Sequence, residues 1–197
     1  MNAYIEKLMG QAKALGDDVY DISAHILTDP KFPLWSGSSK PYQHHYGKGG
    51  LVQHTSEVVD LCFRTKSYYD HIHEIDSKEL FFSAFFHDVG KMYDYRPTYD
   101  SQQNEDYNDW VSTPHKRYIH HISRSAIMWS KYAIKNEDIY NGYFESVLHA
   151  ILAHHTCREA GSPVAPKSRV AWMVTLCDNM SARIYDADTM DVLDRRK

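Results

Sequence analysis

The stretch FHDVGK (residues 86–91) ends an apolar run, LFFSAFF (80–86), with two adjacent polar side chains, His87 and Asp88. An apolar run of this kind predicts a buried helix, and burying an unpaired imidazole or carboxylate is unfavourable. Adjacent residues on a helix point about 100° apart, so the two side chains can reach two sides of one pocket. The stretch therefore predicts that polar residues from elsewhere in the chain meet His87 and Asp88.

Further histidines and aspartates interrupt other apolar segments in the same way. The full set, spread over five predicted helices, is His54, His87, Asp88, His121, His154, His155 and Asp178. One such residue is more often a hydrogen-bonded core group, but seven are difficult to satisfy separately, and a shared ion satisfies them together. Imidazole and carboxylate ligands suit one or two divalent transition metals (Mn, Fe, Ni, Co or Zn) and are compatible with Mg. A carboxylate such as Asp88 can bridge two cations, which together polarise a phosphoryl oxygen and activate a water at neutral pH.

The composition is that of an ordinary folded domain. The chain has 197 residues, of which 43% are hydrophobic and 24% charged, and its net charge is −4. No apolar run approaches the roughly 18 residues of a membrane-spanning helix, and the N-terminus is typical of an amphipathic helix, not of a signal peptide. Three distant cysteines (Cys62, Cys157 and Cys177) favour buried free thiols in a reducing cytoplasm. The charge gives no sign of a strongly basic face, which favours a small phosphorylated substrate, such as a nucleotide, without excluding nucleic acid.

Apolar residues recur mostly at helical spacing, and no set of alternating strands is visible. The sequence therefore predicts an all-α bundle forming a single domain (1–197), with N-terminal helices (1–40) packing on a metal-binding core (41–190). The expected helices span 2–15, 17–28, 50–67, 77–88, 118–135, 142–156 and 167–188. The polar segment 92–117 predicts a long loop or a small hairpin, either a solvated excursion or a lid. Gly49 and Gly50 predict a tight turn before the helix of His54, and Gly90 predicts a C-terminal helix cap.

The segments that flank these residues carry a family resemblance. They are HHYGKGGLVQHT (44–55), FHDVGK (86–91), HHI (120–122), ILAHHTCREAGSP (151–163) and TLCDNMSA (175–182). Together they resemble the HD-domain superfamily of metal-dependent phosphohydrolases, in particular the HD portion of bacterial 3′-5′ exoribonucleases and of conjugative relaxases. The resemblance covers roughly residues 40–185 and implies an HD-type helical bundle that hydrolyses a phosphate ester.

The resemblance also implies roles for individual residues. The ligands implied for a first metal are His54, His87, Asp88 and Asp178, with Asp88 bridging. The ligands implied for a second metal are His121, His154 and His155. Lys91 matches a lysine that contacts the phosphoryl group or assists proton transfer, so Asp88 and Lys91 are the implied catalytic residues.

Departures from the family pattern weaken any transfer of the exact substrate. The exoribonucleases carry an N-terminal nucleic-acid-binding barrel, whereas the N-terminal segment here is expected to be helical. Ser181 stands where the family often has a second aspartate, and His120 replaces a small residue. The segment 169–171 also lacks an acidic residue that the family often has.

The predicted substrate contacts are Lys91, Arg158 and His45. Arg158 could equally be a surface charge, and His44 and His45 could line the mouth of the site or merely fill a turn. The aromatic residues of the polar segment could stack on a base or pack against the domain; they are Tyr93, Tyr95, Tyr99, Tyr107 and Trp110.

The leading hypothesis for the function is metal-dependent hydrolysis of a phosphate ester in a nucleotide or related phosphorylated metabolite, with a metal-activated water. One alternative is a 3′-5′ exonuclease or phosphodiesterase on single-stranded RNA or DNA. Two others are a mixed-valent diiron oxygenase of the HD type and a non-catalytic, metal-containing binding module. The sequence leaves the oligomeric state open.

Overall fold

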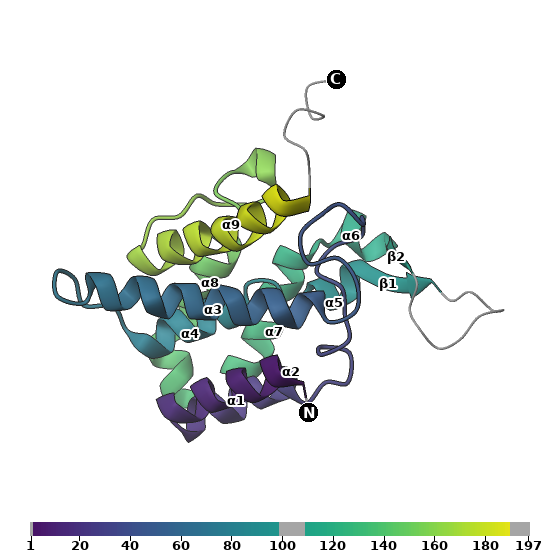
Figure 1. Cartoon of the computed structure of the whole chain (residues 1–197). Helices are drawn as coiled ribbons and strands as arrows, with labels where there is room; N and C mark the ends of the chain where they lie inside the picture. The colour runs from purple at the N-terminus through teal and green to yellow at the C-terminus, as the bar shows by residue number, and fades with distance from the viewer. Residues whose placement is uncertain (1, 99–108, 190–197) are drawn as a thin grey trace.

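The computed structural model describes residues 2–98 and 109–189, with side chains described as far as residue 184. The chain forms a helical bundle with one small antiparallel hairpin, which confirms the predicted all-α class (Figure 1). The longer helices are α1 (Ala3–Leu15), α2 (Asp17–Leu27), α3 (Gly50–Tyr69), α4 (Ser77–Phe86), α7 (His121–Ala133), α8 (Glu137–Ala153) and α9 (Arg169–Thr189). The shorter helical segments are α5 (Lys91–Asp94), α6 (Pro114–Tyr118) and a 3₁₀ turn at Arg158–Ala160. In the described part of the chain, no helix combines the length and the apolar character needed to cross a membrane.

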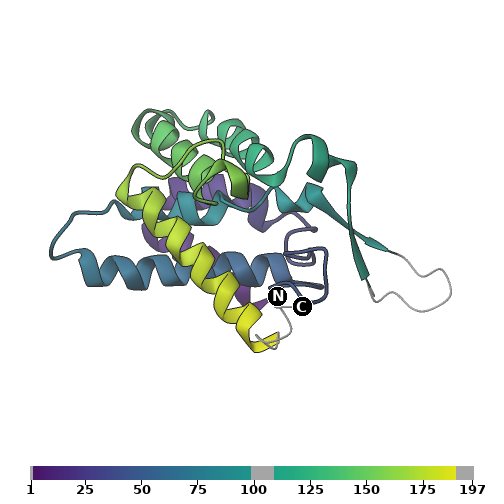
Figure 2. The ribbon, with the colours of Figure 1, turned by 90° about the horizontal axis from the view of Figure 1, so that it is seen from above.

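Helix α4 forms the centre of the bundle. Asp76 caps its N-terminus by accepting hydrogen bonds from the backbone N–H groups of Lys78 and Glu79, and every residue from Leu80 to Phe86 is buried. Helices α3, α7, α8 and α9 pack around α4, and α1 and α2 also contact it. Figure 1 shows α1 and α9 on opposite sides of α3, and Figure 2 shows α9 lying obliquely across α3. One continuous apolar cluster therefore extends from Ile5 in α1 to Cys177 in α9.

The predicted helix 118–135 is interrupted. Helix α6 ends at Tyr118, and α7 begins only at His121, because His120 has a φ of 68°. A positive φ is uncommon for a residue with a side chain and ends the helical hydrogen-bond ladder. Helix α8 begins earlier than predicted, because the side chain of Asn136 accepts a hydrogen bond from the backbone N–H of Ile139.

Gly90 is not the left-handed helix cap that its position after the HD pair predicted. Its φ is −62°, in the ordinary right-handed region. A Cβ atom at Gly90 would lie only 2.2 Å from the backbone carbonyl oxygen of His121. The glycine therefore allows the turn after α4 to contact the start of α7 directly, which brings Asp88 next to His121.

The polar segment predicted at 92–117 contains a short hairpin. Strand β1 (Tyr95–Thr98) pairs antiparallel with β2 (Asp109–Ser112), and the predicted stacking residues Tyr99 and Tyr107 lie outside the described residues. Tyr95 and Trp110 are buried, and Trp110 contacts Trp35 edge-on with ring centroids 5.2 Å apart. These two aromatic side chains therefore pack against the domain, as the second interpretation of the segment predicted.

Candidate metal centre

Seven polar side chains from five segments converge at one place in the bundle. His54 lies on α3, His87 and Asp88 on the turn after α4, His121 on α7, His154 and His155 after α8, and Asp178 on α9. They form two groups, in each of which one potential ligand atom per residue lies within 4.8 Å of the others. The first group is His54, His87, Asp88 and Asp178, and the second is Asp88, His121, His154 and His155. Asp88 belongs to both groups, as a ligand that bridged two metal ions would.

The first group is buried around two close imidazole nitrogens. The Nε2 atom of His54 lies 3.1 Å from Asp178 Oδ1 and 3.3 Å from Asp88 Oδ2. The Nε2 atom of His87 lies 3.3 Å from His54 Nε2 and 3.5 Å from Asp88 Oδ2. Burial lowers the pKa of His54, but the carboxylates of Asp178 and Asp88 outweigh burial and raise it. Two imidazoles and two carboxylates that converge on one point are a donor set that suits a divalent cation.

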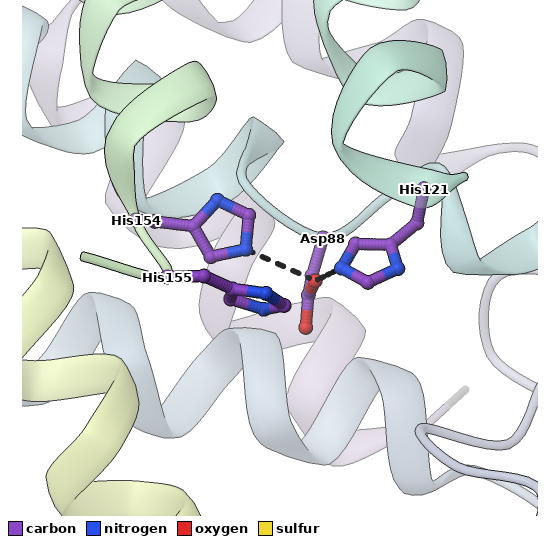
Figure 3. Close-up of side chains that lie close together, drawn as sticks. All are labelled: Asp88, His121, His154 and His155. Atoms are coloured by element: carbon purple, nitrogen blue, oxygen red, sulfur yellow. Dashed lines mark ion pairs between the residues drawn. The ribbon is translucent and has the colours of Figure 1, made fainter. Parts of the chain in front are cut away.

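The second group holds three buried polar atoms that lack hydrogen bonds. His121 Nε2 and His154 Nε2 lie 3.4 and 3.6 Å from Asp88 Oδ1, and Figure 3 shows both rings directed at this carboxylate. None of the three atoms has a hydrogen-bond partner among the described residues. Leaving such atoms unpaired in the interior is unfavourable, and a cation between them would satisfy all three at once. The residues present therefore fit a second metal ion.

The other nitrogen of each histidine is held in place by a hydrogen bond. The Nδ1 atom of His87 lies 2.7 Å from the carbonyl oxygen of Ala84, and that of His154 lies 2.7 Å from the carbonyl oxygen of Ile151. His155 Nδ1 makes the same contact, 2.8 Å from the carbonyl oxygen of Ala160. A carbonyl accepts only, so each ring donates from Nδ1, and in the neutral ring this leaves the lone pair on Nε2, the form that binds metals.

Asp94, on α5, orients His121 in the same way, and sequence reasoning missed it. Its Oδ2 atom accepts hydrogen bonds from the backbone N–H of His121 at 3.1 Å and from His121 Nδ1 at 2.9 Å. Its Oδ1 atom lies 2.8 Å from His115 Nδ1, and Arg124 Nε donates to His115 Nε2 at 3.1 Å. Burial raises the pKa of Asp94, but the hydrogen bonds from His121 and His115 and the charges of nearby histidines together outweigh burial and lower it. A chain of hydrogen bonds thus runs from Arg124 through His115 and Asp94 to the predicted ligand His121.

We expect Asp94→Asn to weaken metal binding in the second group by about 10–100-fold, the usual effect of removing a partner that orients a ligand. The amide can still accept from His121, but its NH₂ group then faces the Nδ1–H of His115. Titration with metal in the presence of a competing chelator would measure both affinities. Asp21→Asn, at an exposed position on α2, serves as the control. Unchanged affinity of both groups in Asp94→Asn would contradict the orienting role.

Glu57 and Ser181 form a second chain behind His54, and neither was predicted. His54 Nδ1 lies 3.1 Å from Ser181 Oγ, and Ser181 Oγ donates to Glu57 Oε2 at 2.9 Å. Burial raises the pKa of Glu57, but hydrogen bonds from His45 and Gln53 outweigh it and lower the pKa to about 2. Ser181 stands where the family often has an aspartate, and its hydroxyl connects His54 to the carboxylate of Glu57. Glu57 and Ser181 each follow a predicted ligand by three residues on a helix, which places each of them on the same helix face as that ligand but does not show that the two side chains meet.

Lys91 is buried next to the shared carboxylate. Its Nζ atom lies 2.6 Å from Asp88 Oδ2. Burial lowers the pKa of Lys91, but the ion pair with Asp88 and the other nearby charges, Asp178 among them, together outweigh burial and raise it. The side chain therefore keeps its positive charge at neutral pH, which suits contact with a phosphoryl group and not release of a proton.

A polar cleft of about 390 Å³ opens beside the two groups, with Asp178 of the first group and His155 of the second in its lining. Its lining residues include Gln43, His44, Lys91, His155, Asp178 and Arg183. Two predicted substrate contacts are not among them. Arg158 is exposed and lines a different depression with His149 and Cys157, because the 3₁₀ turn directs it away. His45 is buried, and its Nε2 atom lies 2.8 Å from Glu57 Oε2, so His44 takes the place at the cleft.

Comparisons with known proteins agree with this arrangement. The family model described as HD domain matches residues 51–183. A 3′-5′ exoribonuclease YhaM from Bacillus licheniformis is 27% identical over 147 residues, which cover 74% of this chain and 42% of that protein. The protein of the same name from Bacillus pumilus is 27% identical over 175 residues, or 87% of this chain and 50% of that protein. The chain thus spans half the length of these relatives or less, and no solved structure matches it significantly.

Proposed function

This chain belongs to the HD-domain family, most of whose members are metal-dependent hydrolases, and we propose that it cleaves a phosphate ester of a nucleotide. The observation that supports this best is the pair of ligand groups that share Asp88, directly below a polar cleft with Lys91 in its wall. Shared-carboxylate sites of this kind hold two cations that act on one phosphoryl group. The residues that would hold these two cations are the seven that make up the two groups.

The chemistry of the reaction divides between the metals and the side chains. Divalent metals bound here would polarise the phosphoryl oxygens and make a water nucleophilic at neutral pH. Asp88, Asp178 and the five histidines would hold these metals, and the Nδ1 hydrogen bonds of the histidines keep the rings from turning away. Lys91 contributes a fixed positive charge beside Asp88, where it can stabilise negative charge on the transferred phosphoryl group.

The cleft favours a substrate of nucleotide size. Its volume of about 390 Å³ lies at the lower end of the range for small-molecule sites, roughly 300–1,000 Å³. The net charge of −4 gives the chain no general attraction for a long polyanion. A single-strand 3′-5′ exonuclease is the second candidate, because both curated relatives carry that activity in their names.

Turnover tests would separate these candidates. We expect protein loaded with Mn, Ni or Co to hydrolyse bis-p-nitrophenyl phosphate and at least one nucleotide, and a chelator to abolish both reactions. Progressive shortening of labelled single-stranded RNA, with little release of phosphate from mononucleotides, would favour the exonuclease. Absence of hydrolysis with every metal and substrate would contradict the proposal. Bound iron with an oxygen-dependent spectral change would favour oxygenase chemistry instead.

A further inference from the structure

Building on the proposed function, we propose that His44 presents a hydrogen-bond acceptor to the cleft and selects substrates with a sugar hydroxyl near the scissile phosphate. His44 lines the cleft together with Lys91 and Asp178. Its neighbour His45 is buried behind it and lies against Glu57. His44 therefore faces the cleft, and the adjacent His45 faces the interior.

The backbone holds this pair of histidines rigidly. His45 has a φ of 53°, an uncommon conformation for a residue with a side chain. Its carbonyl oxygen accepts a hydrogen bond from the backbone N–H of Gly37 at 2.9 Å. A Cβ atom at Gly50 would lie 1.8 Å from the same oxygen. Gly50 therefore lets the loop rest directly on the first turn of α3, and the position of His44 follows from that contact.

Glu57 determines where the protons of both rings lie. Its carboxylate accepts hydrogen bonds from Gln53 Nε2 and Ser181 Oγ, both at 2.9 Å. An ionised carboxylate can only accept, so His45 carries a proton on Nε2 and, as a neutral ring, offers a lone pair on Nδ1. His44 Nδ1 lies 3.1 Å from His45 Nδ1 and must be the donor of that contact. The second nitrogen of His44, Nε2, is consequently unprotonated.

With both rings neutral, the contacts from Glu57 through His45 to His44 allow one proton arrangement, in which His44 Nε2 is an acceptor.

The position of this acceptor indicates what it binds. No group in the described part of the chain hydrogen-bonds His44 Nε2, and the His44 residue lines the cleft. Phosphate oxygens are themselves acceptors, so this atom disfavours them and favours an O–H group. In a nucleotide, the sugar is bonded directly to the phosphate. With the phosphate at Lys91, a sugar hydroxyl is the nearest donor that can reach His44, which lines the same cleft. A site that hydrogen-bonds a substrate hydroxyl discriminates against analogues that lack it.

Kinetics on matched substrates would test the selection. Manganese-loaded wild type, His44→Phe and His44→Gln would be compared on adenosine monophosphates and their 2′-deoxy and 3′-deoxy analogues. We expect removal of one hydroxyl to lower wild-type kcat/KM about tenfold or more, His44→Phe to reduce this difference to within about twofold, and His44→Gln, which keeps an acceptor, to restore part of it. His71→Gln, at an exposed loop position, is the control. Equal wild-type rates on all analogues, or discrimination that survives in His44→Phe, would overturn the role of His44. Failure to hydrolyse even bis-p-nitrophenyl phosphate would instead count against the proposed function.

A spectroscopic measurement tests the proton arrangement without any turnover. Long-range ¹H–¹⁵N correlation spectra of metal-free protein with labelled histidine distinguish the two neutral imidazole forms. We expect His44, assigned by its absence in His44→Phe, to carry its proton on Nδ1 at neutral pH. A proton on Nε2 of His44 would overturn the inference.

Discussion

Asp88→Asn is expected to prevent binding of both metal ions and to lower kcat/KM at least about a thousandfold. The substitution keeps the size of the side chain but removes its charge and replaces one of its two oxygens. Asp88 Oδ2 faces His54 and His87, and Oδ1 faces His121 and His154. Metal stabilisation of a phosphoryl transition state is worth several kcal/mol, and each 1.36 kcal/mol is about tenfold in rate. One substitution therefore disables both ligand groups.

Because Lys91 forms an ion pair with Asp88, the experiment needs a second variant that also removes the lysine charge. Removing the Asp88 carboxylate alone leaves a buried ammonium without the partner that lies 2.6 Å away, which costs about 3–5 kcal/mol. The double variant Asp88→Asn/Lys91→Met removes both charges, so we expect it to fold like the wild type and still lack metal. Elemental analysis after dialysis and circular dichroism would measure the two properties, with the exposed Asp138→Asn as control. Full metal content in either folded variant would contradict the bridging role of Asp88.

The sequence was sufficient to predict which residues converge. Histidines and aspartates such as His54 and Asp178 interrupt apolar helices, and a buried polar group must have a partner. The geometry brings all seven of them into two adjoining groups. Whether they bind metal stays a prediction that the Asp88 variants test.

The residues behind the ligands could not be predicted in the same way. Asp94 lies in a polar segment where an acidic residue is normally exposed, and it is buried only because α5 packs against the start of α7. Glu57 and Ser181 are 124 positions apart, and their contact depends on how α9 crosses α3. Interactions of this range are properties of the packed bundle, so single-residue patterns carry little information about them.

Local backbone geometry explains the other differences from prediction. His120 breaks a helix without glycine or proline, so the sequence contained no ordinary break signal. His44 and His45 were indistinguishable in sequence, and the positive φ of His45 decides which one faces the cleft. The sequence Asn136-Glu137-Asp138, in contrast, is a recognisable helix start that would have placed α8 correctly.

The metal-free protein is expected to lose stability steeply as the pH falls below about 6.5. Burial lowers the pKa of His121 to about 4, although Asp94 opposes it. Burial, together with the charge of His154, lowers the pKa of His155 to about 3. His44 reaches about 2 through burial and the charge of Lys91. Each of these rings is held neutral in the folded protein at a pH where it would be protonated in the unfolded chain.

The sign of the effect follows from the number of protons bound in each state. Between about pH 6.5 and the lowered pKa values, the unfolded chain binds more protons at these three positions, so stability rises with pH and falls on acidification. His54 has a raised pKa and acts in the opposite direction, since it stabilises the folded protein at low pH and this contribution is lost as pH rises. A fully buried group contributes about 1.4 kcal/mol per pH unit, and His44 and His155 contribute less because they line the cleft. The net expectation is a loss of about 2 kcal/mol per pH unit.

Urea unfolding in the presence of a chelator, followed by circular dichroism from pH 7.5 to pH 5, would measure this slope. Stability of an ordinary domain is only about 5–15 kcal/mol, so a slope of this size brings the metal-free protein close to unfolding near pH 4. His155→Gln should reduce the slope because it removes one of the three rings, whereas the exposed His71→Gln should leave it unchanged. A free energy of unfolding that is constant between pH 7 and pH 5 would show that these imidazoles are not held neutral by burial, and the arrangement of the centre would have to be different from the one described.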